Sequence, residues 1–280
     1  MCEACNPART PQRYRHRWEM PMVVTAWMIS LLAVGVSLTA TDDIVASARA
    51  NDVEWLLNLG YLVLFTPIMA LITRFYRAAK ERSNGIKVGP QQFSHIWDIY
   101  TDLLTRFDLP TAPALYVVNG NGAVNAYAMS CSLRRKYVVL NAEIAGLGQH
   151  DPELVRFVLA HELAHHKLGH VALVRISIAA VMHALFLPGK AMIRAQEYSA
   201  DRLAMAVCPE AADTLVFLSV GPWMAQQLNA EAYVDQMVED SRGLMVRVVN
   251  MASDHAVMSK RYKALRDIAK HGFDKHGEMF

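Results

Sequence analysis

Charged residues are absent from two long segments near the N-terminus. Residues 20–41 contain none, and neither do residues 55–73. At about 1.5 Å per residue, a helix over the first segment spans roughly 33 Å, close to the ~30 Å hydrocarbon core of a bilayer. Pro67 lies in the second segment, where a membrane helix tolerates a kink. The pattern predicts a transmembrane hairpin over residues 20–75, with spans at 20–41 and 55–73.

The residues that flank these segments predict the orientation of the hairpin. Both outer flanks are basic and the connecting loop is mainly acidic. The charged residues that give this pattern are Arg9, Arg13, Arg15 and Arg17 before the first segment, Asp42, Asp43, Asp52 and Glu54 between the two segments, and Arg74, Arg77, Lys80, Arg82 and Lys87 after the second. Basic flanks remain cytoplasmic, so residues 1–19 are expected to be a disordered basic cytoplasmic tail. Two alternatives are a pair of buried core helices and, for residues 1–41, a cleaved signal peptide, whose apolar region would be too long.

The remaining sequence predicts a mainly α domain with a small β-sheet over residues 76–280. Helical apolar spacing covers residues 93–109, and β-rich segments follow at 114–120, 124–130 and 136–144. Asp151 is a predicted N-cap, with Pro152 at the first helical position. Further helices are predicted at 190–207, 210–228, 230–250 and 257–271. The uncharged stretch 176–189 is short for a span, so we expect it to pack in the domain or dip into the membrane interface, a second hairpin being the alternative.

Composition narrows the class of protein. The net charge is +2 and 53% of the residues are hydrophobic, which indicates no nucleic-acid partner and agrees with membrane segments. The cysteines are Cys2, Cys5, Cys131 and Cys208. A cytoplasmic location predicts reduced thiols. Cys2 and Cys5 lack the second pair of ligands that a closed zinc site needs, and we interpret them as thiols on the tail, with metal bridging between chains or S-acylation as alternatives.

The candidate chemistry lies in the sequence HELAHHKLGH at residues 161–170. His161 and His165 are four residues apart on a predicted helix, which places them on one face at a separation that suits one Zn²⁺. Glu162 can reach a water on that metal without binding the metal itself, as a general base does. His166 and His170 are interpreted as polar-face residues or as residues that support the ligands.

A catalytic zinc site needs a third protein ligand. The metzincin extension of the motif fails, because Gly169 comes one position late and Val171 stands where its third histidine would be. Glu197 and Asp201 are four residues apart on a later predicted helix, so Glu197 is the candidate third ligand and Asp201 could orient a ligating imidazole. The alternative is an amphipathic helix in which Glu197 pairs with Arg194.

With these motifs, residues 90–270 resemble the integral-membrane M48 metallopeptidases, which include HtpX-type quality-control proteases and CAAX-processing enzymes. The resemblance implies a zincin-like, gluzincin-type domain with His161, His165 and Glu197 as zinc ligands, Glu162 as base and Asp201 as support. The segment from Asn125 to Ile144 resembles the family's strand pair, and Asn125, Ala126 and Tyr127 would bind substrate on its edge strand. The segment 253–265 resembles a C-terminal motif whose His255 and Arg261 would approach the reacting carbonyl or buttress the site, although Ala256 replaces a proline.

The expected protein is therefore a membrane-anchored zinc endopeptidase with one zinc per chain. Its expected partners are the lipid bilayer and polypeptide substrates, namely membrane or misfolded proteins, with no nucleic acid. The expected location is the bacterial inner membrane, with the catalytic domain in the cytoplasm. Alternatives are a CAAX-type processing protease, which needs an intramembrane chamber that two spans cannot build, a catalytically silent zinc-binding membrane adaptor, and a membrane scaffold with fortuitous histidines.

Overall fold

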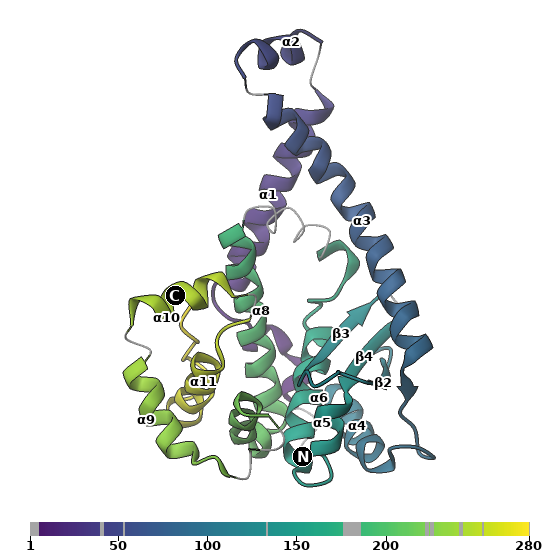
Figure 1. Ribbon diagram of the computed structural model, residues 1–280, viewed down its shortest axis with the longest axis vertical. Helices are drawn as coiled ribbons and strands as arrows, with labels where there is room; N and C mark the ends of the chain where they lie inside the picture. The colour runs from purple at the N-terminus through teal and green to yellow at the C-terminus, as the bar shows by residue number, and fades with distance from the viewer. Residues whose placement is uncertain are drawn as a thin grey trace.

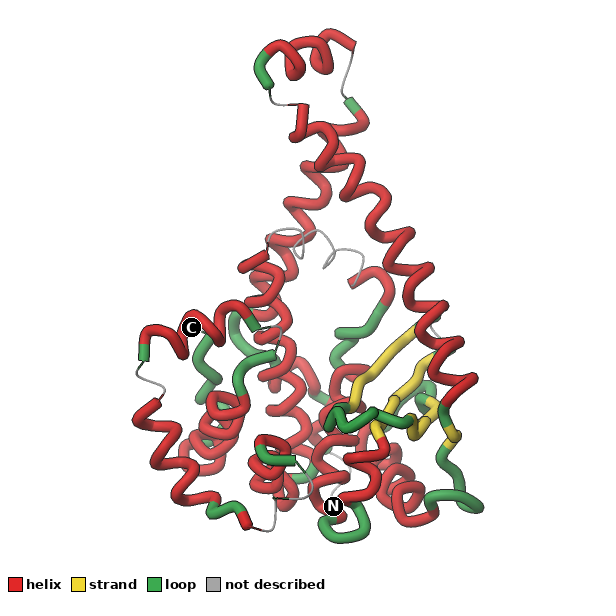
Figure 2. Tube along the Cα trace, viewed as in Figure 1, coloured by secondary structure: helices red, strands yellow, loops and turns green. Residues whose placement is uncertain are grey.

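The computed structural model describes residues 6–39, 42–52, 54–132, 134–175, 186–221, 224, 227–240, 243–253 and 255–279 (Figure 1). Helices make up most of the described chain, and one four-stranded sheet lies at the side of the body (Figure 2). The predicted class, mainly α with a small β-sheet, is confirmed at this level.

A helical hairpin projects from the body. It consists of α1 (Glu19–Leu38), α2 (Asp42–Ala50) and α3 (Glu54–Asn84), and α1 and α3 pack on each other with α2 at the tip (Figure 1). The exposed large apolar side chains of α1 and α3 include Val24, Trp27, Met28, Leu31, Leu32, Phe65, Ile68, Met69 and Ile72. Within the described ranges, no helix combines the length and the apolar character that crossing a membrane requires.

The segment before α1 is ordered against the domain. It forms the short 3-10 helices η2 (Pro7–Arg9) and η3 (Pro11–Tyr14), and Ala8 is fully buried. Main-chain groups here bind distant side chains, since His16 N donates to Ser199 Oγ and Arg202 Nε donates to Tyr14 O. The predicted disorder is therefore wrong for residues 6–19. Their order comes from these long-range hydrogen bonds, which leave no periodic pattern in the sequence.

The sheet presents one edge strand toward the middle of the molecule. Its order is β1-β2-β4-β3, with β1 (Ile86–Lys87), β2 (Ala114–Val118), β3 (Ala126–Ser130) and β4 (Lys136–Asn141). β2 and β4 are parallel, whereas β1 and β3 are antiparallel to their neighbours. The three predicted strands are confirmed. β1 was not predicted, because two residues are too short to show an alternating pattern.

The helices that surround the core carry the remaining residues. They are α4 (Ser94–Phe107), α5 (Ala142–Leu147), α6 (Pro152–Lys167), α8 (Phe186–Val207), the 3-10 helix η4 (Pro209–Ser219), α9 (Ala230–Asp240), α10 (Leu244–Ala252) and α11 (Met258–His271). The predicted helix 210–228 is wrong in type, since a 3-10 helix ends at Ser219, and the predicted helix 230–250 is two helices, with Gly243 capping the second. Of the apolar stretch 176–189, residues 176–185 lie outside the described part.

Candidate metal centre

Helix α6 begins as the sequence predicts and carries the H-E-x-x-H motif in its second half. Asp151 Oδ1 accepts a hydrogen bond from Leu154 N at 3.1 Å, and Pro152 occupies the first turn. The helix is buried on nearly every side, and His161 and Glu162 are 7% and 6% exposed. Burial deprives these polar side chains of water, so they depend on protein partners or on a metal for their interactions.

Helix α8 brings the second part of the site. Small residues line the core at both helices, with Ala160 and Ala164 on α6 and Ala200 and Ala204 on α8 all fully buried. Small side chains let the two backbones approach closely, and α6 and α8 are in extensive contact. Glu197 on α8 is 4% exposed and lies opposite the motif of α6.

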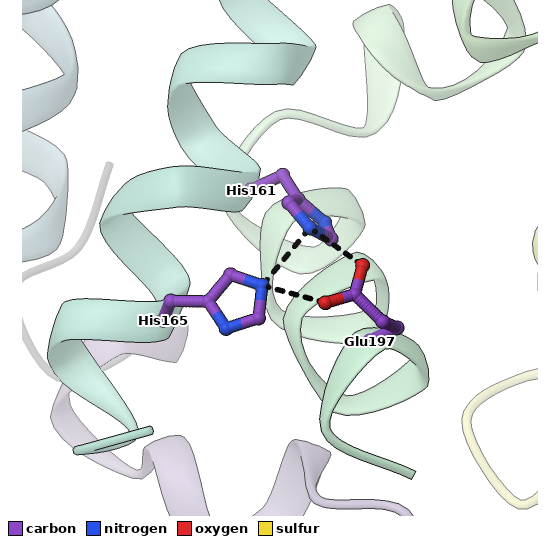
Figure 3. Close-up of side chains that lie close together, drawn as sticks. All are labelled: His161, His165 and Glu197. Atoms are coloured by element: carbon purple, nitrogen blue, oxygen red, sulfur yellow. Dashed lines mark hydrogen bonds and ion pairs between the residues drawn. The ribbon is translucent and has the colours of Figure 1, made fainter. Parts of the chain in front are cut away.

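The structure brings the three predicted ligands together (Figure 3). His161 Nε2 lies 3.0 Å from His165 Nε2 and 3.3 Å from a Glu197 carboxylate oxygen, and His165 Nε2 lies 3.3 Å from the other oxygen. Bonds of 2.0–2.1 Å to a tetrahedral zinc separate neighbouring ligand atoms by roughly 3.3 Å. Two imidazole nitrogens and one carboxylate at this spacing therefore fit a zinc ion.

His161 is oriented by the buried carboxylate of Asp201. His161 Nδ1 lies 2.8 Å from Asp201 Oδ1, and Arg261 donates to both Asp201 oxygens, at 2.8 and 2.6 Å. Burial alone would raise the pKa of Asp201, but the charge and hydrogen bonds of Arg261 keep it below its ordinary value. Asp201 thus remains ionised, accepts the Nδ1 proton of His161 and leaves Nε2 free for a metal.

The same neighbours determine the proton affinity of His161. Burial alone would lower the pKa of this imidazole, but the charge of Asp201 and hydrogen bonds to Asp201 and Glu197 raise it to about 10. The pKa of Glu197 lies well below its usual range, because His165, His161 and His255 stabilise the carboxylate against the cost of burial. Without a metal, the cluster therefore retains a proton that a divalent cation has to displace.

His165 is supported by His170, which follows the end of α6. Gly169 has φ +72°, a conformation that favours glycine, and it reverses the chain so that His170 N donates to His165 O at 3.0 Å. The two rings meet with Nδ1 of His170 2.9 Å from Nδ1 of His165. His170 Nε2 lies 3.2 Å from Glu19 Oε1 at the start of α1. His170 is thus a supporting residue, one of its two predicted roles, whereas no sequence pattern predicted a role for Glu19.

His166 points to another part of the domain. Its Nε2 lies 3.0 Å from Tyr137 O on β4, and burial lowers its pKa to about 4. A neutral His166 therefore ties α6 to the sheet and takes no part in the metal cluster.

A cleft of about 220 Å³ opens beside the cluster and is lined by two of the three ligands, His161 and Glu197. Glu162 lines this cleft, which is the position that its predicted role as general base requires. The rest of the wall is mainly apolar and includes Val124, Asn125, Ala126, Ile144, Phe157, Val158, Leu215, Leu218, His255, Ala256, Met258 and Arg261.

His255 and Arg261 occupy different positions at this cleft. His255 is exposed and its Nδ1 lies 3.0 Å from Glu197 Oε2, a contact that raises the pKa of the imidazole. Arg261 is buried and contacts Asp201 much more closely than Glu197, whose Oε2 is 3.9 Å away. Of the two predicted roles, the geometry gives Arg261 that of a buttress.

Arg194 does not form the pair with Glu197 that the alternative interpretation required. Its Nη1 donates instead to the carbonyls of Met251 and Ser253, at 2.8 and 3.1 Å. This buried arginine therefore holds the segment just before His255.

The predicted substrate residues lie on the edge strand and before it, with different orientations. Asn125 and Ala126 line the cleft, whereas the Tyr127 ring packs under Arg77 of α3, with the guanidinium carbon 5.8 Å from the ring centroid. Asn125 O accepts from Asn141 N, so main-chain alternation turns the N–H and C=O of Ala126 and Ala128 toward the outer edge of β3.

Neither of the two described cysteines contributes to the cluster. Cys131 and Cys208 are buried free thiols, and Cys2 and Cys5 lie outside the described residues.

Comparison with known proteins places this site in a family. Residues 90–269 match the peptidase family M48. No curated protein and no solved structure matches the chain. The matched segment covers more than half of the 280 residues and includes all three ligands, so the chain belongs to this family of zinc-dependent metallopeptidases, which act on polypeptides.

Proposed function

We propose that this M48 peptidase is a membrane-anchored zinc endopeptidase that acts on membrane or misfolded proteins. The observation that carries the proposal is the convergence of His161, His165 and Glu197 at tetrahedral spacing, with Glu162 on the wall of the adjoining cleft. A structural zinc site closes its metal with four protein ligands, whereas a catalytic site has three and an open position.

The residues around the cluster have separate roles in peptide hydrolysis. His161, His165 and Glu197 would hold a zinc ion, which would supply the Lewis acidity needed to polarise a carbonyl and acidify a water. Glu162 takes the proton of the attacking water and passes it to the leaving amine. Arg261 and Asp201 fix the His161 ring, and apolar side chains such as Phe157 and Leu215 on the cleft wall lower the local polarity, which strengthens charge interactions beside them.

The outer edge of β3, which pairs with no further strand in the described part of the chain, suits an extended polypeptide. The outward main-chain groups of Ala126 and Ala128 can pair with a substrate strand next to the cleft. Main-chain hydrogen bonding depends little on the substrate's sequence. Binding of this kind therefore fits a protease that acts on many unfolded chains in quality control or regulated proteolysis.

Membrane attachment is proposed through the hairpin of α1 and α3. Its support is the set of large apolar side chains on the outside of both helices, together with the basic flanks of the two uncharged segments. We further propose that the catalytic domain faces the cytoplasm of a bacterial cell. The test is alkaline extraction of membranes from cells that make the full chain. We expect the protein to stay in the pellet until detergent is added, and release by alkali alone would overturn the anchor.

The enzymatic proposal is tested with Glu162→Gln in the purified full chain. We expect about one zinc per chain in both forms, cleavage of an unfolded protein by the wild type, and none by the variant. The matched control is Glu153→Gln in the first turn of the same helix, which should retain activity. Equal cleavage by Glu162→Gln would refute the assigned base, and zinc without cleavage in the wild type would favour a silent adaptor.

A further inference from the structure

Glu19 is a fully buried carboxylate at the first residue of α1, outside the segment that matches the peptidase family. It accepts hydrogen bonds from Arg15, Arg175 and Ser199, and its Oε1 lies 3.2 Å from His170 Nε2. These partners come from the N-terminal segment, from α8 and from the chain after α6. Such a buried acid is costly unless every partner is in place, so its presence calls for a specific role.

The hydrogen bonds from Glu19 lead directly to a metal ligand. When Nε2 of His165 faces a metal, its Nδ1 carries the proton and donates to Nδ1 of His170, 2.9 Å away. His170 then carries its own proton on Nε2, which points to the Glu19 carboxylate. The ionised carboxylate thus fixes the tautomer of His170, and His170 fixes that of His165.

The site is therefore supported from two sides. Asp201 supports His161 directly, and Glu19 supports His165 through one intervening imidazole. Carboxylate–histidine–metal arrangements fix the ring orientation and raise the basicity of the ligand.

We propose that Glu19 is a positioning residue of the metal centre, which holds the ring of His165 in its metal-binding orientation through His170. The inference rests on the proposed zinc site. Because Glu19 begins α1, displacement of the helical hairpin relative to α6 would loosen His165, so the N-terminal segment is part of the functional metallopeptidase unit.

The experiment measures zinc affinity of the purified full chain by competition with a chelating indicator. We expect Glu19→Ala and His170→Ala each to weaken binding by about 10–100-fold, the range for residues that orient a ligand. The double variant should bind zinc no more weakly than His170→Ala alone, because both residues act on His165 along the same path. The matched control is His166→Ala, which replaces a buried histidine next to His165 on α6 that contacts Tyr137 O instead of the cluster, and its zinc affinity should remain within about twofold of the wild type.

A second readout separates positioning from general destabilisation. With Co²⁺ in place of zinc, the visible absorption bands report ligand geometry, and they should change in Glu19→Ala and His170→Ala but not in His166→Ala. If Glu19→Ala does not fold, Glu19→Asp keeps the charge beside Arg15 and Arg175, and its shorter side chain withdraws from His170, so the same loss of affinity is expected.

The outcomes distinguish this inference from the proposed function. Wild-type zinc affinity and unchanged cobalt bands in both Glu19 and His170 variants would overturn the inference alone. Additive losses in the double variant would overturn it too, since they would mean independent effects. A wild-type chain that binds no zinc would overturn the proposed function and this inference together.

Discussion

Asp201 Oδ1 lies 2.8 Å from Nδ1 of His161, on the side of the ring opposite Glu197. The contact determines which nitrogen of this imidazole is available to a metal, and several measurable properties depend on it.

Asp201→Asn should weaken zinc binding by about 10–100-fold, because the amide carries no charge and can present its N–H to the ring instead of accepting from it. Competition with a chelating indicator measures the change. Asp213→Asn, an exposed acid on η4, is the control and should bind zinc like the wild type. Equal affinity in the two variants would show that Asp201 does not orient His161.

Arg261→Met should destabilise the metal-free protein by about 3–5 kcal/mol, since it leaves the buried Asp201 carboxylate without its cationic partner. Urea unfolding of the apo-protein gives the free energy of unfolding. Arg266→Met on the same helix is less buried and should cost less than about 1 kcal/mol. A similarly small loss in Arg261→Met would contradict the buttressing role.

The free energy of unfolding should fall as the pH falls from about 6.5 to 4. Burial lowers the pKa of His166 to about 4, against 6.5 for an unperturbed histidine, so over this window the unfolded chain binds a proton that the folded chain does not. The loss attributable to His166 is about 3 kcal/mol. Urea unfolding at several pH values measures it, with His166→Gln as the comparison, because glutamine can still donate to Tyr137 O and does not titrate. A variant with the wild-type pH slope would disprove the assignment.

Zinc affinity should rise with pH between about 6 and 9. In the apo-protein the pKa of His161 is about 10, so zinc has to displace a proton, and each unit of pH strengthens binding by up to about tenfold. Titration with zinc at fixed ionic strength measures the slope. In Asp201→Asn the pKa of His161 should be lower. The zinc affinity of this variant should therefore stop rising at a lower pH than that of the wild type. A pH-independent affinity in the wild type would show that His161 does not take up this proton.

Local sequence patterns predicted much of the site. The four-residue spacing of His161 and His165 puts both rings on one face of any α-helix, and Asp151 with Pro152 located the start of that helix. Tyr127 shows the limit of such patterns. The alternation of strand β3 turns its ring toward α3, away from the cleft that Asn125 and Ala126 line.

The predictions that failed concern interactions between distant segments. Prolines and arginines before residue 19 suggested disorder, yet side chains of α8 hold this segment through Ser199 and Arg202. The alternative pairing of Arg194 with Glu197, three residues apart on one helix, also fails, because Arg194 binds carbonyls of the segment before His255. Neither contact leaves a periodic signal in the sequence.

The sequence by itself determined that His161 and His165 share one face of α6 and where the neighbouring strands lie, because short-range geometry and side-chain chemistry fix these features, and it offered Glu162 as candidate base and Glu197 as candidate third ligand. Only the tertiary structure decided what supports the ligands. Glu19 meets His170 across 151 positions of the chain, and Arg261 meets Asp201 across 60. Such pairs form because burial removes water from charged groups and forces each to find a protein partner, and which partner is within reach depends on how the whole chain packs.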